Sequence, residues 1–261
     1  MLLAQILLAC VAGSVLSLAL AAIAAFRVKS RWVPTLVSYA VGALLGAVFL
    51  DLLPHIFADT KSPARVAAFI LFGILAFFVL EKLLLWRHHH GDEGEGDHGH
   101  HHGHAPGHDS GRSGYMIVVG DSFHNFTDGV IIAAAFLADP RVGTVTAVAI
   151  IAHEIPQEIG DFLVLLNSGF SRRKALLMNA LSGLATVAGA LLAYFALARV
   201  TQWMPEILAI AAASMIYVAV ADLIPGLHKR TAIRETLMQV AFIGIGIASI
   251  WVIHAWLFPE T

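Results

Sequence analysis

Two short polar motifs within apolar stretches of this sequence carry side chains of the types that can bind metal ions. The first is HNFTDG, from His124 to Gly129, and the second is HEIPQEIGD, from His153 to Asp161. Imidazole nitrogens combined with carboxylate oxygens suit Zn2+, and also Fe2+, Mn2+, Co2+ and Cd2+, whereas Ca2+ and Mg2+ prefer oxygen ligands alone. The two motifs therefore predict a site for a divalent metal ion.

Helical spacing would gather the donors of each motif on one face. His124 and Asp128 are four residues apart, as are His153 and Gln157, so each pair shares a helix face. His124 lies about ten residues into its apolar segment, and His153 lies about eleven residues into the next, which runs the opposite way; at 1.5 Å per residue both are about 15 Å deep. We expect the two motifs to meet near the middle of a membrane.

The elements that position these motifs are membrane helices. Of 261 residues, 58% are hydrophobic and only 13% charged, and the mean hydropathy is +0.78. A soluble domain has about a quarter of its residues charged, and about 20 helical residues cross the bilayer core. Eight apolar segments are long enough: 2–26, 32–57, 66–86, 114–138, 142–170, 175–198, 205–228 and 237–258. The predicted fold is all-α, a polytopic membrane protein of eight transmembrane helices.

The charged residues bear on orientation and on partners. With the N-terminus outside, only Lys61, Arg65, Arg141 and Arg199 of the 16 basic residues lie on the outer side. The positive-inside rule then places both termini outside the cytoplasm, and we expect a multi-pass protein of the cell membrane in contact with lipid. A net charge of −2 without a basic face argues against nucleic acid as a partner. Cys10, alone, can form neither a disulfide nor a thiolate metal site within one chain.

One loop, residues 88–112, is rich in histidine and is expected on the cytoplasmic side. Its composition cannot pack a core, so we predict disorder, and its imidazoles suit Zn, Cu, Ni or Fe ions. We interpret it as a metal-capture loop within a single transmembrane domain of residues 1–261, with a purification tag or a hydrophilic spacer as the alternative. The histidines concerned are His88, His89, His90, His98, His100, His101, His102, His104 and His108.

Seven acidic residues lie well inside the predicted helices, with no Lys or Arg at similar depth to pair with them. They are Asp51, Asp121, Asp128, Glu154, Glu158, Asp161 and Asp222. An unpaired acid at the bilayer centre costs about 3 kcal/mol, which favours a bound cation. Protonated carboxyls or acids at helix ends are the alternative, and they fit Asp121 and Asp161 best.

Three further residues are interpreted from their helices alone. Pro156 either kinks its helix or frees a carbonyl oxygen near the ligands, and the sequence favours neither. His254 and Trp251, on the last apolar segment, are interpreted as packing or interfacial residues.

The motifs resemble those of the ZIP metal-ion transporters, whose fourth and fifth helices carry H-N-x-x-[DE]-G and H-E-x-P-x-E-x-G-D. The resemblance extends to the His-rich loop after the third helix and to two D-L-x-P patterns, which begin at Asp51 and Asp222. It implies eight helices, with the first three and the last three forming an inverted repeat around the fourth and fifth. It also implies import of divalent metal ions, Zn2+ foremost, into the cytoplasm. Neither an enzymatic activity nor a resident cofactor is expected.

The resemblance further implies a binuclear site at the middle of the membrane. One metal ion would bind His124, Asp128, His153 and Gln157, and the other Asn125, Asp128, Glu154 and Gln157, with Asn179 as an additional ligand. Gln157 departs from the family pattern, which has His or Glu there, so that Glu158 is an alternative ligand.

The path of the ion is expected to follow the two D-L-x-P patterns. The ion would enter past Asp51 and His55 and leave past Asp222 toward the His-rich loop. The sequence leaves open which divalent ion is carried, what drives transport, and whether the chain forms a homodimer.

Two other classes of protein combine some of these features. A cation-diffusion exporter pairs an H-x-x-x-D helix with a His-rich inner loop, but it has six helices and a soluble C-terminal domain, which we do not expect here. An intramembrane zinc hydrolase would use H-E-x-x-H to activate water. Gln157 stands where that motif needs its second histidine, and Pro156 interrupts the helix.

Overall fold

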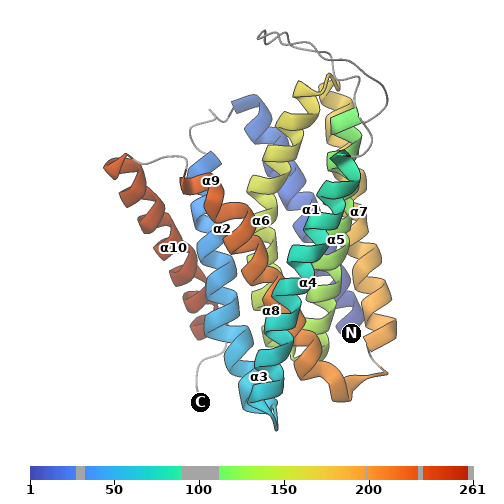
Figure 1. The fold of residues 1–261 in the computed structure, drawn as a ribbon, viewed down its shortest axis with the longest axis vertical. Helices are drawn as coiled ribbons and strands as arrows, with labels where there is room; N and C mark the ends of the chain where they lie inside the picture. The colour runs from blue at the N-terminus through green and yellow to red at the C-terminus, as the bar shows by residue number, and fades with distance from the viewer. Residues whose placement is uncertain (28–32, 90–111, 198, 229–231, 258–261) are drawn as a thin grey trace.

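A computed structural model describes residues 1–27, 33–89, 112–197, 199–228 and 232–257 (Figure 1). Within these residues every regular element is helical. The uninterrupted helices are α1 (Leu2–Arg27), α4 (Pro63–His89), α5 (Arg112–Ala138), α6 (Pro140–Asn167), α7 (Arg172–Leu197) and α10 (Ile233–Leu257). Two further stretches each consist of several consecutive helical segments. The first contains α2 (Val33–Ala47), η2 (Val48–Leu52) and α3 (Leu53–Asp59). The second contains η3 (Thr201–Trp203), α8 (Met204–Tyr217), η4 (Val218–Leu223) and α9 (Ile224–His228). Each predicted apolar segment corresponds to one of these helices or stretches.

Six helical stretches in the described part of the chain are long and apolar enough to cross a membrane. They are Leu2–Ile23, Val33–Asp59, Pro63–Leu80, Arg172–Leu197, Met204–His228 and Ile233–Ala255. Helices α5 and α6 are not among them, because the polar motifs that they carry lower their hydropathy. The chain is therefore a multi-pass helical membrane protein, and the count of eight spans stays a prediction.

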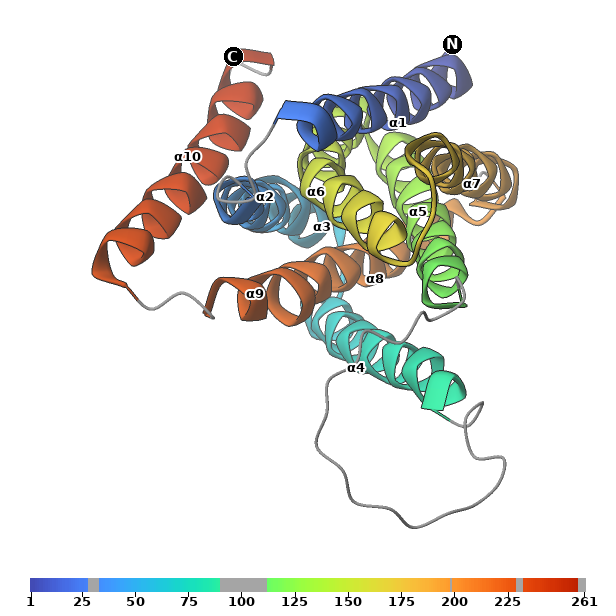
Figure 2. The same cartoon turned by 90° about the horizontal axis from the view of Figure 1, so that it is seen from above.

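The helices form a bundle with α5 and α6 at its centre. Helix α6 packs against α1, α2 and α5, and α5 packs against α6, α7 and α8, as the view from above shows (Figure 2). At the periphery α4 packs on α8, and α10 packs on α2. Small residues such as Ala133, Ala134 and Ala212 are fully or almost fully buried between the helices, which lets neighbouring backbones approach closely.

At four glycines, the backbones of two pairs of helices pack in direct contact. A Cβ atom on Gly129 of α5 would overlap the carbonyl oxygen of Thr186 on α7, and one on Gly189 of α7 would overlap the backbone of α5. Likewise, a Cβ atom on Gly42 of α2 would overlap the backbone of α10, and one on Gly246 of α10 would overlap the backbone of α2. Any larger residue at these four positions would force the helices of a pair apart.

Both D-L-x-P patterns interrupt their helices with a π-helical turn. The amide of Leu53 donates to the carbonyl of Val48, and the amide of Ile224 donates to the carbonyl of Ala219, so each bond spans five residues. A proline directly follows each donor; because its ring clashes with the carbonyl four residues earlier, a widened turn relieves the clash. The two patterns therefore share a local backbone, and each turn holds an acid, Asp51 or Asp222.

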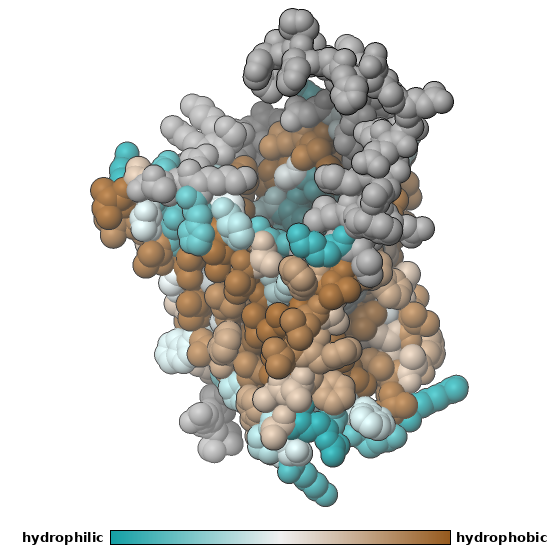
Figure 3. Space-filling model, in the orientation of Figure 1, coloured by the Kyte–Doolittle hydropathy of each residue, from teal (hydrophilic) through white to brown (hydrophobic). Residues whose placement is uncertain are grey.

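Large apolar side chains cover the outside of the bundle. Leu71 and Phe72 on α4, Leu184 and Phe195 on α7, and Leu237 on α10 are each more than half exposed. Figure 3 shows that hydrophobic residues occupy the middle of the visible face, with hydrophilic residues toward its ends. Such a broad apolar surface is expected where lipid, rather than water, surrounds the protein.

Candidate metal centre

A tight connection brings the two motifs to the same height. Helix α5 ends at Ala138 and α6 begins at Pro140, with the Asp139 side chain capping α6 by accepting from the amide of Arg141. His124 lies 14 residues before the end of α5, and His153 lies 13 after the start of α6, which at 1.5 Å per residue places both about 20 Å from the turn. The antiparallel pair therefore places the motifs side by side.

Four side chains converge between α5 and α6. They are His124, Asp128, His153 and Glu154, and one ligand atom from each lies within 4.8 Å of all the others. His153 is 1% exposed, Asp128 3% and Glu154 7%, whereas His124 is half-buried. Two imidazoles and two carboxyl groups thus meet in a space that water hardly reaches.

The separations between these ligand atoms match those around a tetrahedral zinc ion. His153 Nε2 lies 3.1 Å from both His124 Nε2 and Asp128 Oδ2, and 3.7 Å from Glu154 Oε1. His124 Nε2 lies 3.5 Å from Asp128 Oδ2 and 3.6 Å from Glu154 Oε1. Zn–N and Zn–O bonds of 2.0–2.1 Å give a tetrahedral edge of about 3.3–3.4 Å. The four atoms could therefore bind one ion with only small shifts.

Several polar atoms of this group lack hydrogen bonds. Among the described residues, Asp128 Oδ2, Glu154 Oε1 and His153 Nδ1 are buried without a well-formed hydrogen bond. A buried oxygen or nitrogen left in this state is costly. A cation between the two carboxylates would satisfy both oxygens.

The amides that the resemblance assigns to the metal ions have other partners. Asn125 Nδ2 and Gln157 Nε2 each donate to Asp121 Oδ1 over 3.1 Å. Asn125 Oδ1 also accepts from Thr186 Oγ1 on α7 at 2.9 Å. Both amides thus hold Asp121 in place, and their role as ligands stays a prediction.

Glu158 and Asn179 also lie outside the group of four. Asn179 Nδ2 on α7 donates to the backbone carbonyl of Glu158 at 3.0 Å, and both residues are buried. Pro156 lies within α6, which continues through it as one helix to Asn167.

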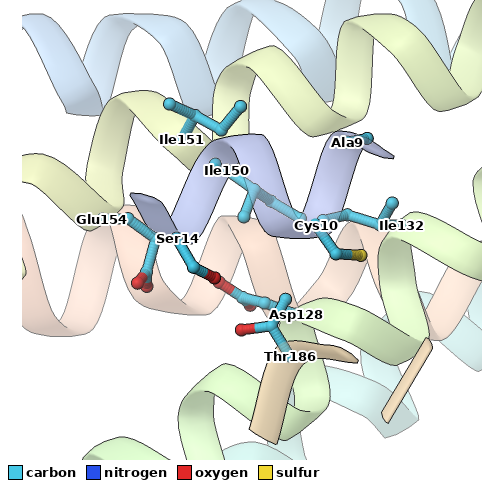
Figure 4. Close-up of a pocket in the computed structure, with 10 residues that line it drawn as sticks. Ala9, Cys10, Ser14, Asp128, Ile132, Ile150, Ile151, Glu154 and Thr186 are labelled. Carbon is cyan, nitrogen blue, oxygen red and sulfur yellow. The ribbon is translucent and has the colours of Figure 1, made fainter. Parts of the chain in front are cut away.

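A small cavity adjoins the metal centre on its α1 side. Asp128 and Glu154 line it together with Cys10, Ser14 and Thr186, and Figure 4 shows these side chains around the space. Cys10 is 1% exposed. The sequence did not indicate that the single cysteine lies beside the two acids, because nothing in α1 resembles a metal-binding motif.

A second cavity, which His124 of the metal centre helps to line, lies toward the end of the bundle where α4 ends and α5 begins. Its lining includes His124, Gly120 and Phe123 of α5, with Tyr217 of α8 and Asp222 of η4. The predicted exit residue Asp222 thus shares a cavity with a residue of the metal centre.

At the opposite end of the bundle, Asp51 has a partner that the sequence did not indicate. His254 Nδ1 on α10 lies 2.8 Å from Asp51 Oδ1, while Asp51 Oδ2 is buried without a hydrogen bond. The interpretation of His254 as a packing or interfacial residue missed this contact. His55, the other predicted entry residue, lies 3.5 Å from the exposed Asp59.

Most of the predicted metal-capture loop lies outside the described residues, which omit 90–111. Helix α4 extends through His88 and His89, so these two histidines end a helix instead of beginning the loop.

The fold and the donor set define a class: a multi-pass membrane protein whose central helices could bind a divalent cation. A model of the ZIP zinc transporter family matches residues 1–112 and 87–254, and the chain belongs to this family. It is 32% identical over 230 residues to zinc transporter ZIP13 of Pongo abelii, covering 81% of this chain and 64% of that protein. It is 31% identical over 264 residues to ZIP13 of Danio rerio, covering 82% and 74%. It is 27% identical over 244 residues to zinc transporter YKE4 of Saccharomyces cerevisiae, covering 82% and 68%.

These relatives decide several of the predictions. The chain spans slightly less than two thirds of the Pongo abelii protein. The relatives are named as zinc transporters, and the prediction that the chain belongs to the ZIP family is confirmed. The predictions of metal-ion transport and of a protein without enzymatic activity agree with these names. The exporter and hydrolase alternatives find no support in these matches.

Proposed function

We propose that this chain imports divalent metal ions, Zn2+ foremost, through the centre formed by His124, Asp128, His153 and Glu154. The observation that carries the proposal is the set of ligand separations, 3.1 to 3.7 Å, close to the edge of a zinc tetrahedron. The same ligands are compatible with Fe2+, Mn2+, Co2+ and Cd2+. The metal ion is the cargo, and carboxylate ligands are labile enough to release it.

The proposed topology has eight spans, with helices α5 and α6 crossing at the centre. The first three and last three spans would form an inverted repeat, which the matching π-helical turns at Asp51 and Asp222 support. Both termini would lie outside the cytoplasm, in the cell membrane, and residues 88–112 would form a cytoplasmic loop of one transporter domain, 1–261.

The proposed path runs from Asp51 and His55 through the metal centre to Asp222. Support for its inner half comes from the cavity that His124 and Asp222 share. Support for its outer half comes from the buried Asp51 oxygen that lacks a hydrogen bond. At the Asp51 oxygen, a passing cation would replace a missing hydrogen bond.

The second metal position implied by the resemblance would use Asn125, Asp128, Glu154 and Gln157, with Asn179 or Glu158 as further ligands. In this structure both Asn125 and Gln157 donate to Asp121. Occupation of that position would therefore require both amides to release Asp121 and turn their oxygens toward the ion.

Uptake into proteoliposomes tests the proposal. Radiolabelled Zn2+, Fe2+, Mn2+ and Cd2+ would be offered to the wild type, to Asp128→Ala and to a chain lacking residues 88–109. We expect Asp128→Ala to abolish uptake, because it removes a ligand, and the deletion to retain most of it. Loss of uptake in the deletion alone, with Asp128→Ala fully active, would show that the site lies elsewhere.

A further inference from the structure

Three acidic side chains lie next to the metal centre, on the side where α5 begins and α6 ends. Asp121 precedes His124 by one helical turn, and Glu158 and Asp161 follow Glu154 by about one and two turns. At 1.5 Å per residue the group lies about 5–10 Å from the centre along the helices. Figure 1 shows that these ends of α5 and α6 lie together at the end of the bundle where α4 also ends.

The position of Asp121 is fixed by two amides. Its Oδ1 accepts hydrogen bonds from both Asn125 Nδ2 and Gln157 Nε2, each at 3.1 Å. An ionised carboxylate has lone pairs for about four such contacts, so the second oxygen remains available. Asn125 is itself held by Thr186 at 2.9 Å, and the carboxyl group therefore has little freedom to turn away.

Asp161 lies one helical turn after Gln157 on the same face of α6, and Gln157 donates to Asp121, so the carboxyl groups of Asp161 and Asp121 lie near each other. Two neighbouring ionised carboxylates repel each other. A proton or a cation between them would remove that repulsion. In the described part of the chain, no basic side chain forms an ion pair with Asp121, Glu158 or Asp161.

Glu158 provides an independent indication of a ligand. It is 2% exposed, and its Oε2 atom is buried without a hydrogen bond. Glu158 and Asp161 are three residues apart on α6, so their side chains share a face of the helix. An acidic oxygen that is buried, unpartnered and close to two further acids needs a positive charge nearby.

We propose that Asp121, Glu158 and Asp161 form a second cation site, which receives a hydrated divalent ion as it leaves the metal centre. Among the described acids, histidines and cysteine, only the four ligand atoms of the centre all lie within 4.8 Å of one another. The carboxyl groups of the three acids are therefore spaced more widely than these four ligands. That spacing leaves room for water ligands, and an all-oxygen site binds and releases divalent ions readily. Asn125 and Gln157 are then positioning residues that orient Asp121. The direction of this step rests on the proposed import function.

Mn2+ is the probe, because it favours oxygen ligands over imidazole and should therefore bind more tightly to the three acids than to the metal centre, with which it is also compatible. Electron paramagnetic resonance of free hydrated Mn2+ would be followed while the ion is titrated with the full chain in detergent. We expect Glu158→Gln with Asp161→Asn to weaken Mn2+ binding by about tenfold or more, since ligand charge sets affinity at such sites. Asp59→Asn, which removes an exposed acid at the opposite end, and His153→Ala should both retain it.

Zinc uptake supplies the second readout. The double variant should lower the maximal rate while KM stays within about twofold, because the step affected follows entry. Unchanged Mn2+ binding in the double variant overturns the inference, as does an infrared carbonyl band of a protonated carboxyl that persists at saturating Mn2+. If the double variant does not fold, Glu158→Gln alone decides by the same measurement. Normal zinc uptake by His153→Ala would instead overturn the proposed function.

Discussion

Replacing His153 by alanine removes one of the four ligand atoms at the metal centre. His153 is the most buried of the four residues and its Nε2 atom lies within 3.7 Å of the other three ligand atoms. No other imidazole lies in the group except His124. The remaining donors would be one nitrogen and two carboxylate oxygens.

The size of the effect follows from the number of ligands. Four-ligand zinc sites in proteins contribute about 10–16 kcal/mol of binding free energy, so one quarter is about 2.5–4 kcal/mol. At 1.4 kcal/mol per factor of ten, zinc affinity at the centre should fall by about two to three orders of magnitude. Uptake of labelled zinc into proteoliposomes, measured as kcat/KM, should fall to a similar extent.

Thr146→Val is the matched control for this variant. Thr146 is a buried residue on the same helix, 1% exposed, about two turns from His153 toward the start of α6. The substitution is nearly equal in volume and should leave uptake unchanged. If His153→Ala folds and still transports zinc with a kcat/KM within about threefold of the wild type, His153 is not a ligand and the tetrahedral reasoning fails.

Three further predictions concern packing, the outer acid and the cysteine. Gly246→Ala should lower the thermal unfolding midpoint, because overpacking costs about 1–3 kcal/mol, whereas Gly244→Ala on the same helix meets open space and should not; equal midpoints would contradict the close helix contact. His254→Ala should leave Asp51 buried without its partner, at a cost of about 1–3 kcal/mol, and should reduce zinc uptake, with His254→Gln restoring part of it if a hydrogen bond is what matters. Mercuric ion should block uptake by the wild type and spare Cys10→Ala, since the thiol faces the cavity beside the metal centre; equal inhibition of both would place the sensitive group elsewhere.

Much of the fold follows from the sequence because lipid imposes simple rules. Uninterrupted apolar runs are expected to be helices in a membrane, and α6 begins at Pro140, two residues after the end of α5. The bounds of the apolar segments made the meeting of His124 and His153 predictable, since each lies about 15 Å into its own segment. The helices and the depth of the site in the membrane could thus be predicted from the spacing of residues in the sequence.

Contacts between helices could not be predicted from residue spacing. Periodicity shows which residues share a face of one helix, but it does not show how neighbouring helices are rotated about their axes. Gln157 and Asn125 turn their amides to Asp121, and His254 reaches Asp51 across 203 residues of sequence. Such partners depend on packing between segments, which no local pattern encodes.

The glycine contacts described above also restrict how the bundle can move. Where two backbones touch, one helix cannot slide or roll on the other without driving an α-carbon into a carbonyl oxygen. Helices α5 and α7 must therefore travel as one rigid body, and α2 and α10 as another. Any motion that opened the metal centre would therefore have to occur between these bodies and their neighbours, for example at the cavity that His124 of α5 and Asp222 of η4 line.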